Sequence, residues 1–197
     1  MIIQTGMRII TKDEFTLDRK ELSDAITKGA VFVYPTDTIY GIGCNALDDR
    51  SVARIRELKS RSAAPFSVIA PSAAWIRQHC HVSPTAEKWL EKLPGPYTLI
   101  LRMKDKSCVA KEVTQGLDTL GVRIPAHWIS KAVTELGFPV VTTSVNKTGK
   151  EYMNSIDDMD PEIKANVDFI IDEGEKRGKP STIVHLEEEK VMVKERR

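Results

Sequence analysis

Pro35-Thr36-Asp37-Thr38-Ile39-Tyr40-Gly41-Ile42-Gly43 is the most informative stretch of this 197-residue chain, because it directly follows an apolar run. The run, Val-Phe-Val-Tyr at residues 31–34, has the β-branched and aromatic content of a buried strand, which Pro35 ends. Two glycines allow the backbone to approach a ligand closely. The sequence therefore predicts a strand that ends in a polar loop, where hydroxyls, a phenol and backbone amides share one surface.

An amphipathic helix is predicted downstream at residues 48–58. Val52, Ile55 and Leu58 recur there at helical spacing. The helix would deliver Lys59 and Arg61 just beyond its end. Two cations beside a hydroxyl-rich loop suit a phosphate group.

Each of these polar residues also has a simpler interpretation. Tyr40 could only pack, and Thr36 and Thr38 could only complete a turn. Lys59 and Arg61 could be a solvated helix end that interacts favourably with the helix dipole. The functional interpretation therefore depends on several motifs occurring together in order.

The composition is typical of one globular domain spanning residues 1–197. Hydrophobic residues make up 41% and charged residues 29%, and the formal net charge is +1. Such a balance gives no global electrostatic field for nucleic acid or membrane, so any basic site must be local. No apolar run is long enough to span a bilayer, and residues 1–7 are too short and too polar for a signal peptide. We therefore expect a cytoplasmic protein.

The cysteines argue against a disulfide framework. Cys44, Cys80 and Cys108 are odd in number and widely separated, so free thiols are predicted. Cys80 lies between His79 and His81, a grouping that resembles a metal site. Because no second ligand pair with zinc-like spacing exists elsewhere, no metal site is expected.

Predicted strands and helices alternate along the chain. Helices are predicted at residues 19–28, 48–58, 73–79, 84–93 and 129–136, and strands at residues 31–34, 66–70, 97–103, 120–124, 139–143, 167–171, 182–186 and 191–193. The last two strands would form a hairpin across the acidic turn at residues 187–189. This pattern predicts an α/β fold with a mixed parallel and antiparallel sheet flanked by helices.

Four polar segments stand at predicted strand ends, where α/β folds collect binding residues. They are the loop with Thr38 and Tyr40, and residues 118–125 (DTLGVRIP), 142–146 (TTSVN) and 179–184 (KPSTIV). They contain no Ser-His-Asp or Cys-His pairing and no carboxylate pair placed for acid-base work. A site built from them would act by positioning and charge, which suits transfer at a phosphate.

Six motifs in order resemble the YrdC-like family, the threonylcarbamoyl-adenylate synthases. The motifs are PTDTIYGIG (35–43), Lys59-Ser60-Arg61, PGPYTLIL (94–101), GVRIP (121–125), TSVN (143–146) and PSTIV (180–184). The resemblance runs from about Val31 to the C-terminus, and chance recurrence of all six motifs is implausible. It implies a single YrdC-like domain with a twisted sheet and a concave ligand-binding face. It further implies the short form, without the extra C-terminal domain of longer relatives.

The resemblance also implies a reaction. In the family, L-threonine and bicarbonate form a carbamate, whose carboxylate attacks the α-phosphate of ATP and expels pyrophosphate with Mg²⁺ assisting. The product, threonylcarbamoyl-AMP, serves threonylcarbamoyladenosine formation in tRNA through a downstream threonylcarbamoyl transferase complex. The implied partners are thus small molecules and a protein complex, with no membrane.

The resemblance places two groups of site residues. L-threonine would be bound by Thr38, Arg123, Thr142 and Ser181, with Tyr40 as a wall, and the nucleotide by Lys59, Arg61, Thr119, Ser144, Asn146 and Arg196. Arg123 would pair with the threonine carboxylate in bidentate geometry. Lys59 and Arg61 would act in catalysis by stabilising the phosphates through the transition state. Thr142 could instead be a strand residue whose hydroxyl is satisfied locally.

This chain departs from the family pattern at several positions. Residues 62–65 (Ser-Ala-Ala-Pro) lack the usual Lys or Asn before Pro, so a nucleotide contact is missing or moved. Ile69 or Ala70 stands where some members have a His, and Tyr152 where some have a Ser. The alignment of Arg196 with a late ATP-binding arginine is loose. These departures leave room for an altered substrate or weakened catalysis.

Two other functions stay open at this stage. One is a non-catalytic module that binds tRNA or double-stranded RNA through local Lys and Arg clusters. Only 6% of residues are aromatic, which offers little for base stacking. The other is a divergent nucleotide-binding paralogue. Pyrophosphate release that depends on threonine and bicarbonate would separate the enzyme from both.

Overall fold

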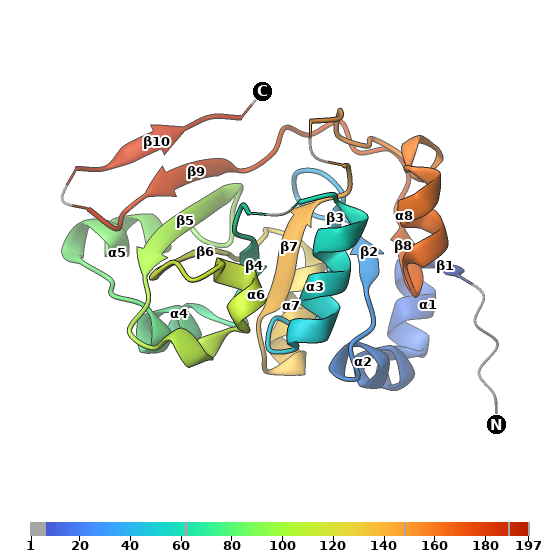
Figure 1. The fold of residues 1–197 in the computed structure, drawn as a ribbon, viewed down its shortest axis with the longest axis horizontal. Helices are drawn as coiled ribbons and strands as arrows, with labels where there is room; N and C mark the ends of the chain where they lie inside the picture. Colours follow the sequence, from blue (N-terminus) through green and yellow to red (C-terminus); the bar gives the residue numbers. More distant parts are fainter. Residues whose placement is uncertain (1–6, 62, 148, 189, 197) are drawn as a thin grey trace.

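A ten-stranded mixed sheet with helices on both faces organises the chain (Figure 1). The computed structural model describes residues 7–61, 63–147, 149–188 and 190–196, so predictions that involve residues 1–6, Ser62 and Glu189 lie outside it. The strands are β1 (Arg8–Thr11), β2 (Phe32–Tyr34), β3 (Gly41–Gly43), β4 (Ser67–Ile69), β5 (Tyr97–Arg102), β6 (Thr119–Arg123), β7 (Val140–Ser144), β8 (Phe169–Asp172), β9 (Thr182–His185) and β10 (Met192–Lys194). The α-helices are α1 (Lys12–Leu17), α2 (Arg19–Thr27), α3 (Asp49–Leu58), α4 (Ala73–His79), α5 (Pro84–Leu90), α6 (Lys111–Thr114), α7 (Trp128–Leu136) and α8 (Pro161–Asn166), with 3-10 turns at Lys106–Cys108 and Ile156–Asp158.

The strand order is β1-β8-β2-β3-β7-β4-β6-β5-β9-β10. The pairs β1/β8, β2/β8, β4/β6 and β5/β9 are parallel, and the other neighbouring pairs are antiparallel. The predicted mixed sheet is therefore confirmed, as is the hairpin of the last two strands. The middle of the sheet is where the polar strand ends of β3, β4, β6 and β7 come together.

Two apolar cores lie on the two faces of the sheet. Along β2 and its flank, Val31 and Val33 enter the larger core, whereas Phe32 and Tyr34 enter the smaller one. This alternation is the period of two expected of a strand that is covered on both faces. Buried residues of α3, α4, α5, α6 and α8 belong to the larger core, and those of α1, α2 and α7 to the smaller.

Helix α3 forms where its apolar spacing predicts it. Asp48 caps it by accepting a hydrogen bond from the Arg50 backbone N–H, and Val52, Ile55 and Leu58 are buried. Burying each such side chain contributes about 1.5–3 kcal/mol, so the helix is anchored by its apolar face. Its end delivers Lys59 to the middle of the sheet.

Several elements differ from the sequence predictions. The predicted polar loop at residues 35–43 contains strand β3, and β1, α1, α6 and α8 were not predicted. The helix predicted at residues 84–93 ends at Leu90, because Lys92 and Leu93 donate backbone hydrogen bonds to carbonyls three residues back, as in a turn. In β3, a Cβ at Gly43 would lie 2.1 Å from the Val141 carbonyl oxygen, so packing against β7 requires glycine there.

The three cysteines are free, as predicted, and the structure shows that all three are buried. In the part of the chain that the structure describes, no three His, Cys, Asp or Glu side chains gather as a metal site would require. No helix among the same residues has the length and apolarity needed to cross a membrane.

Candidate active site

A cavity of about 230 Å³ opens at the polar strand ends in the middle of the sheet. It is lined by Thr36, Thr38, Ile39, Tyr40, Gly41, Arg61, Pro65, Phe66, Ser67, Thr98, Ile100, Thr119, Gly121, Arg123, Thr142, Thr143, Ser144, Ser181, Ile183 and Arg196. All predicted site residues except Lys59 and Asn146 are in this lining. Among the described residues that line the cavity, three are arginines and none is acidic, so the cavity suits an anionic ligand.

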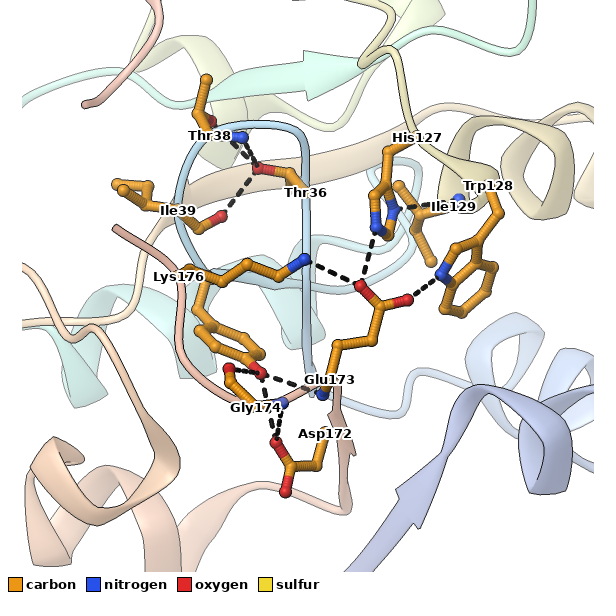
Figure 2. A network of polar contacts seen from close by, with 11 residues as sticks. Thr36, Thr38, Ile39, His127, Trp128, Ile129, Asp172, Glu173, Gly174 and Lys176 are labelled. Atoms are coloured by element: carbon orange, nitrogen blue, oxygen red, sulfur yellow. Dashed lines mark hydrogen bonds and ion pairs between the residues drawn. The ribbon is translucent and has the colours of Figure 1, made fainter. Parts of the chain in front are cut away.

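The loop at residues 36–40 is a hydroxyl-bonded turn. The Thr36 hydroxyl donates to the Ile39 carbonyl at 2.7 Å, and it accepts from the Thr38 backbone N–H at 3.1 Å, as Figure 2 shows. The hydroxyls of Thr36 and Thr38 lie 2.9 Å apart. The turn interpretation is therefore confirmed for Thr36. The Thr38 hydroxyl also lies 3.4 Å from both Nη atoms of Arg123.

Arg123, at the end of β6, is held by a carboxylate that the sequence analysis did not assign. Its Nη2 donates to Asp37 Oδ1 at 2.6 Å, and both of its Nη atoms lie 3.4 Å from the Thr38 hydroxyl. Asp37 Oδ2 also accepts from the Ala126 backbone N–H at 2.9 Å. Arg123 is 6% exposed, and burial lowers its pKa while Asp37 opposes that shift. No described residue accepts from its buried Nε, which leaves donor capacity inside the cavity wall.

Lys59 is not a solvated helix end, because it is only 2% exposed. Its Nζ donates to the backbone carbonyl of Ser144, the last residue of β7, and at 2.5 Å to that of Asn146, two residues further on. Burial lowers the pKa of Lys59 to about 7, with a further contribution from the positive charge of Arg61. The side chain therefore lies behind the cavity, where it ties the end of α3 to the end of β7.

Arg61 reaches the cavity along its own loop. Nε and Nη2 donate to the carbonyls of Ala64 and Pro65 at 3.2 and 2.7 Å, and the guanidinium lies 5.1 Å from the centre of the Phe66 ring. Burial lowers the pKa of Arg61, and the charges of Arg56 and Arg196 act in the same direction. A bound anion would relieve this repulsion.

Ser181 lines the cavity within a chain of polar contacts. Its hydroxyl is 2.7 Å from that of Thr98, and Arg196 Nη2 donates to it at 2.8 Å. Arg196 Nε also donates to the Ser181 carbonyl at 3.0 Å. The β9/β10 hairpin thus brings the end of the chain back to the cavity, next to Ser181.

A family model described as "Telomere recombination", that of Sua5, YciO and YrdC, matches residues 24–196. The chain belongs to the Sua5/YciO/YrdC family. Threonylcarbamoyl-AMP synthases of Pyrococcus abyssi and Xanthomonas axonopodis pv. citri are 36% and 31% identical to it, over 83% and 80% of this chain. The chain covers 49% of the first relative and 86% of the second.

Solved structures of the Sua5/YciO/YrdC family share the fold. P. abyssi Sua5 complexed with L-threonine has a TM-score of 0.82 at 31% identity, over 96% of this chain and 56% of that one. E. coli YciO has a TM-score of 0.80 at 27% identity, over 98% of this chain and 95% of that one. The predicted resemblance and the predicted α/β fold are therefore confirmed.

Tyr40 of the family motif lines the cavity, but its phenol hydroxyl does not face the cavity. Its hydroxyl donates to the Gly174 carbonyl at 2.7 Å, accepts from the Glu173 backbone N–H at 3.0 Å and lies 3.2 Å from Asp172 Oδ1. Burial raises its pKa to about 12. The hydroxyl is thus directed into the structure, and only the remainder of the residue faces a ligand.

Asn146 of the family motif lies beside the cavity. Its side-chain amide donates to the carbonyls of Lys147 and Lys150 at 3.1 and 2.8 Å, and its buried Oδ1 accepts from no described residue. It lines an adjoining hollow that also contains Tyr152. Its link to the site is its backbone carbonyl, which accepts from Lys59.

The family departures fall at two kinds of position. Ile69 and Ala70 are fully buried in apolar surroundings, so this chain has no polar group there. In the loop after Arg61, the described residue Ala64 offers a carbonyl that accepts from Arg56 and Arg61. That loop is therefore held to the end of α3 by backbone contacts.

The sequence analysis missed two site residues, Asp37 and Thr98. Both lie inside the family motifs given above, and each has a sequence feature by which it could have been recognised as a site residue. Asp37 is the charged residue between two threonines of a loop predicted to be close to a strand end, and Thr98 is the hydroxyl residue directly before the apolar run at residues 99–101. Their partners, Arg123 and Ser181, lie 86 and 83 positions away, so only the fold shows the contacts.

Proposed function

We propose that this chain is a threonylcarbamoyl-AMP synthase, which makes threonylcarbamoyl-AMP and pyrophosphate from L-threonine, bicarbonate and ATP. The single observation that carries the proposal is the cavity itself, in which hydroxyl side chains share one space with Arg61, Arg123 and Arg196. We assign Arg123 and Thr38 to the amino-acid end of this cavity and Arg61 to its nucleotide end. Relatives bearing the synthase name and a Sua5 structure with L-threonine support the same activity.

In the proposed reaction, the threonine amine attacks the bicarbonate carbon and water leaves, which gives a carbamate. A carbamate oxygen then attacks the α-phosphorus of ATP, and the bond to the β-phosphate oxygen breaks with release of pyrophosphate. Arg123, Thr38, Thr142 and Ser181 would orient the threonine, while Lys59 and Arg61 would stabilise charge on the phosphates. Thr119, Ser144, Asn146 and Arg196 would complete the nucleotide site.

The residues present do not form a protein-held Mg²⁺ site. Mg²⁺ is usually bound through one or two carboxylates together with substrate phosphates, and the described cavity lining has no carboxylate. The metal of the proposed reaction would therefore arrive on the phosphates of ATP.

The acceptor of the product is part of the same proposal. A carbamoyl-adenylate is a reactive mixed anhydride, so a transferase complex acting on tRNA must consume it. Direct binding of tRNA or double-stranded RNA finds little support, because the lining of the cavity has hydroxyls and arginines in place of exposed aromatic platforms. A cytoplasmic location remains a prediction.

Threonine-dependent pyrophosphate release tests the proposal. Purified protein with Mg²⁺ and ATP is expected to release pyrophosphate only when L-threonine and bicarbonate are both present. Omission of either compound is the control, and mass spectrometry of the product identifies the adenylate. No release above the buffer control would refute the synthase activity and favour the binding module or the divergent paralogue.

A further inference from the structure

Residues 173–180, which we call the strap, connect β8 to β9 and cross the loop at residues 36–40. The contact is close, because a Cβ on Gly178 would lie 2.0 Å from the Thr38 carbonyl oxygen. Such a distance leaves room only for glycine. The strap then continues directly into Ser181, which lines the cavity. The path of the strap therefore affects both the loop at residues 36–40 and Ser181.

One carboxylate at the start of the strap gathers donors from two elements. Glu173 Oε2 accepts from His127 Nε2 at 3.0 Å and from Lys176 Nζ at 2.8 Å, and Oε1 accepts from Trp128 Nε1 (Figure 2). Although burial opposes ionisation, the hydrogen bonds from Lys176, Trp128 and His127 outweigh it and lower the pKa of Glu173 to about 2. The carboxylate thus joins the start of α7 to the strap as an anion.

His127 is oriented so that it can donate to this carboxylate. Its Nδ1 accepts from the Ile129 backbone N–H at 3.4 Å, as the cap of α7, so the proton of the neutral ring is on Nε2. Burial lowers the pKa of His127, which favours the neutral ring. The donor to Glu173 is therefore fixed by a helix cap.

The backbone of the same residue is bonded to the cavity wall. The Glu173 N–H donates to the Tyr40 hydroxyl, which donates in turn to the Gly174 carbonyl, as described above. Side chain and backbone of Glu173 thus connect α7, the strap and the loop that carries Thr38. Neither Glu173 nor His127 lines the cavity.

We infer that Glu173 is a positioning residue for the amino-acid end of the cavity. By holding the strap on α7 and on Tyr40, it keeps Thr38, which the strap contacts at Gly178, in place for the substrate. The identity of that substrate as L-threonine rests on the proposed function. A purely structural role would change stability without separating the two substrates, whereas a positioning role acts on the threonine end and leaves the nucleotide end intact.

Glu173→Gln tests this inference, since the amide keeps the size but offers one acceptor where three donors converge. We expect the KM for threonine to rise about tenfold to a hundredfold, as for a small misplacement of binding groups, with little change in the KM for ATP. Trypsin should cut after Lys176 and Arg177 faster than in the wild type. Glu175→Gln is the matched control, because Glu175 is on the same strap and, among the residues that the structure describes, pairs only with exposed Arg177.

Gly178→Ala gives a second, independent route to the same result. Its methyl group must displace the strap from the Thr38 carbonyl without touching Glu173, so the same increase in the threonine KM is expected. A wild-type threonine KM in Glu173→Gln overturns the inference, whether or not trypsin cleavage is faster, and so does an equal change in both KM values. If the wild type releases no threonine-dependent pyrophosphate, the proposed function fails, and threonine calorimetry with the trypsin rates still decides whether Glu173 positions the strap.

Discussion

Replacing Lys59 with alanine is expected to lower threonine-dependent pyrophosphate release about a hundredfold or more, the size of effect seen when a group that stabilises transition-state charge is removed. The buried amine lies at the junction of α3 and the end of β7, where it donates to the carbonyls of Ser144 and Asn146. Because Lys59 is buried directly behind the cavity, its charge would act on phosphates bound beside Arg61 with little screening by water. Arg61→Ala is expected to lower pyrophosphate release by a similar factor, because Arg61 lines the cavity itself.

The pKa of Lys59 adds a pH dependence to this prediction. With a pKa of about 7, the side chain is charged below pH 7 and loses its proton as the pH rises above it. ATP phosphates favour the charged form, so binding takes up a proton and ATP affinity falls as the pH increases through 7. Calorimetry of ATP binding on both sides of pH 7 measures this, and Lys59→Met should abolish the dependence.

Lys88→Ala is the matched control for Lys59. Lys88 also stands at the C-terminal end of a helix, in the last turn of α5, but it is exposed and is not part of the cavity lining. The Lys88→Ala variant should retain normal turnover. Circular dichroism of Lys59→Ala must show the native fold for the comparison to hold. Normal turnover in Lys59→Ala, together with ATP binding that does not change with pH, would show that Lys59 only packs and does not act on the phosphates.

The sequence predicted elements well where one apolar pattern dominates. Helix α3 was predicted within a residue, because its buried Val52, Ile55 and Leu58 follow the helical period, and α4, which Ser72 caps, was predicted with the bounds observed. Strand β3 was missed for a physical reason. Its Gly-Ile-Gly sequence has low strand propensity, and it is a strand because β2 and β7 pair with it on both sides. Short α1, in which only Phe15 is buried, carries too little periodicity to be recognised.

The sequence predicted which residues form the candidate site better than it predicted how these residues contact one another. Motifs identified which hydroxyls and cations gather at the strand ends, and nearly all of them line the cavity. They did not show that Asp37 pairs with Arg123, nor that Lys59 is buried against backbone carbonyls. Both facts depend on segments that are distant in sequence and adjacent in the sheet. Pairing of this kind follows from strand order, which local patterns do not determine.

Arg123→Lys is expected to weaken threonine binding about tenfold or more while it leaves ATP binding nearly unchanged. The pair with Asp37 occupies Nη2, so the donors that remain for a carboxylate are on Nη1 and on the unpartnered Nε. A lysine could keep the ion pair with Asp37, but its single ammonium cannot replace the Nη1 and Nε donors, which a guanidinium directs away from that pair. Loss of one hydrogen bond to a charged group costs about 1.5–3 kcal/mol, which corresponds to the expected decrease in affinity.

Lysine is a sharper test than alanine at this position. Arg123→Ala would leave Asp37 buried without its partner, which typically costs about 3–5 kcal/mol of stability and would obscure a binding effect. Arg102→Lys, on neighbouring β5 with an exposed partner in Asp118, is the control and should bind both ligands normally. Calorimetry with threonine and with ATP separates the two ends of the cavity. Equal losses for both ligands in Arg123→Lys would mean that Arg123 supports the whole site and does not select the amino acid by its carboxylate.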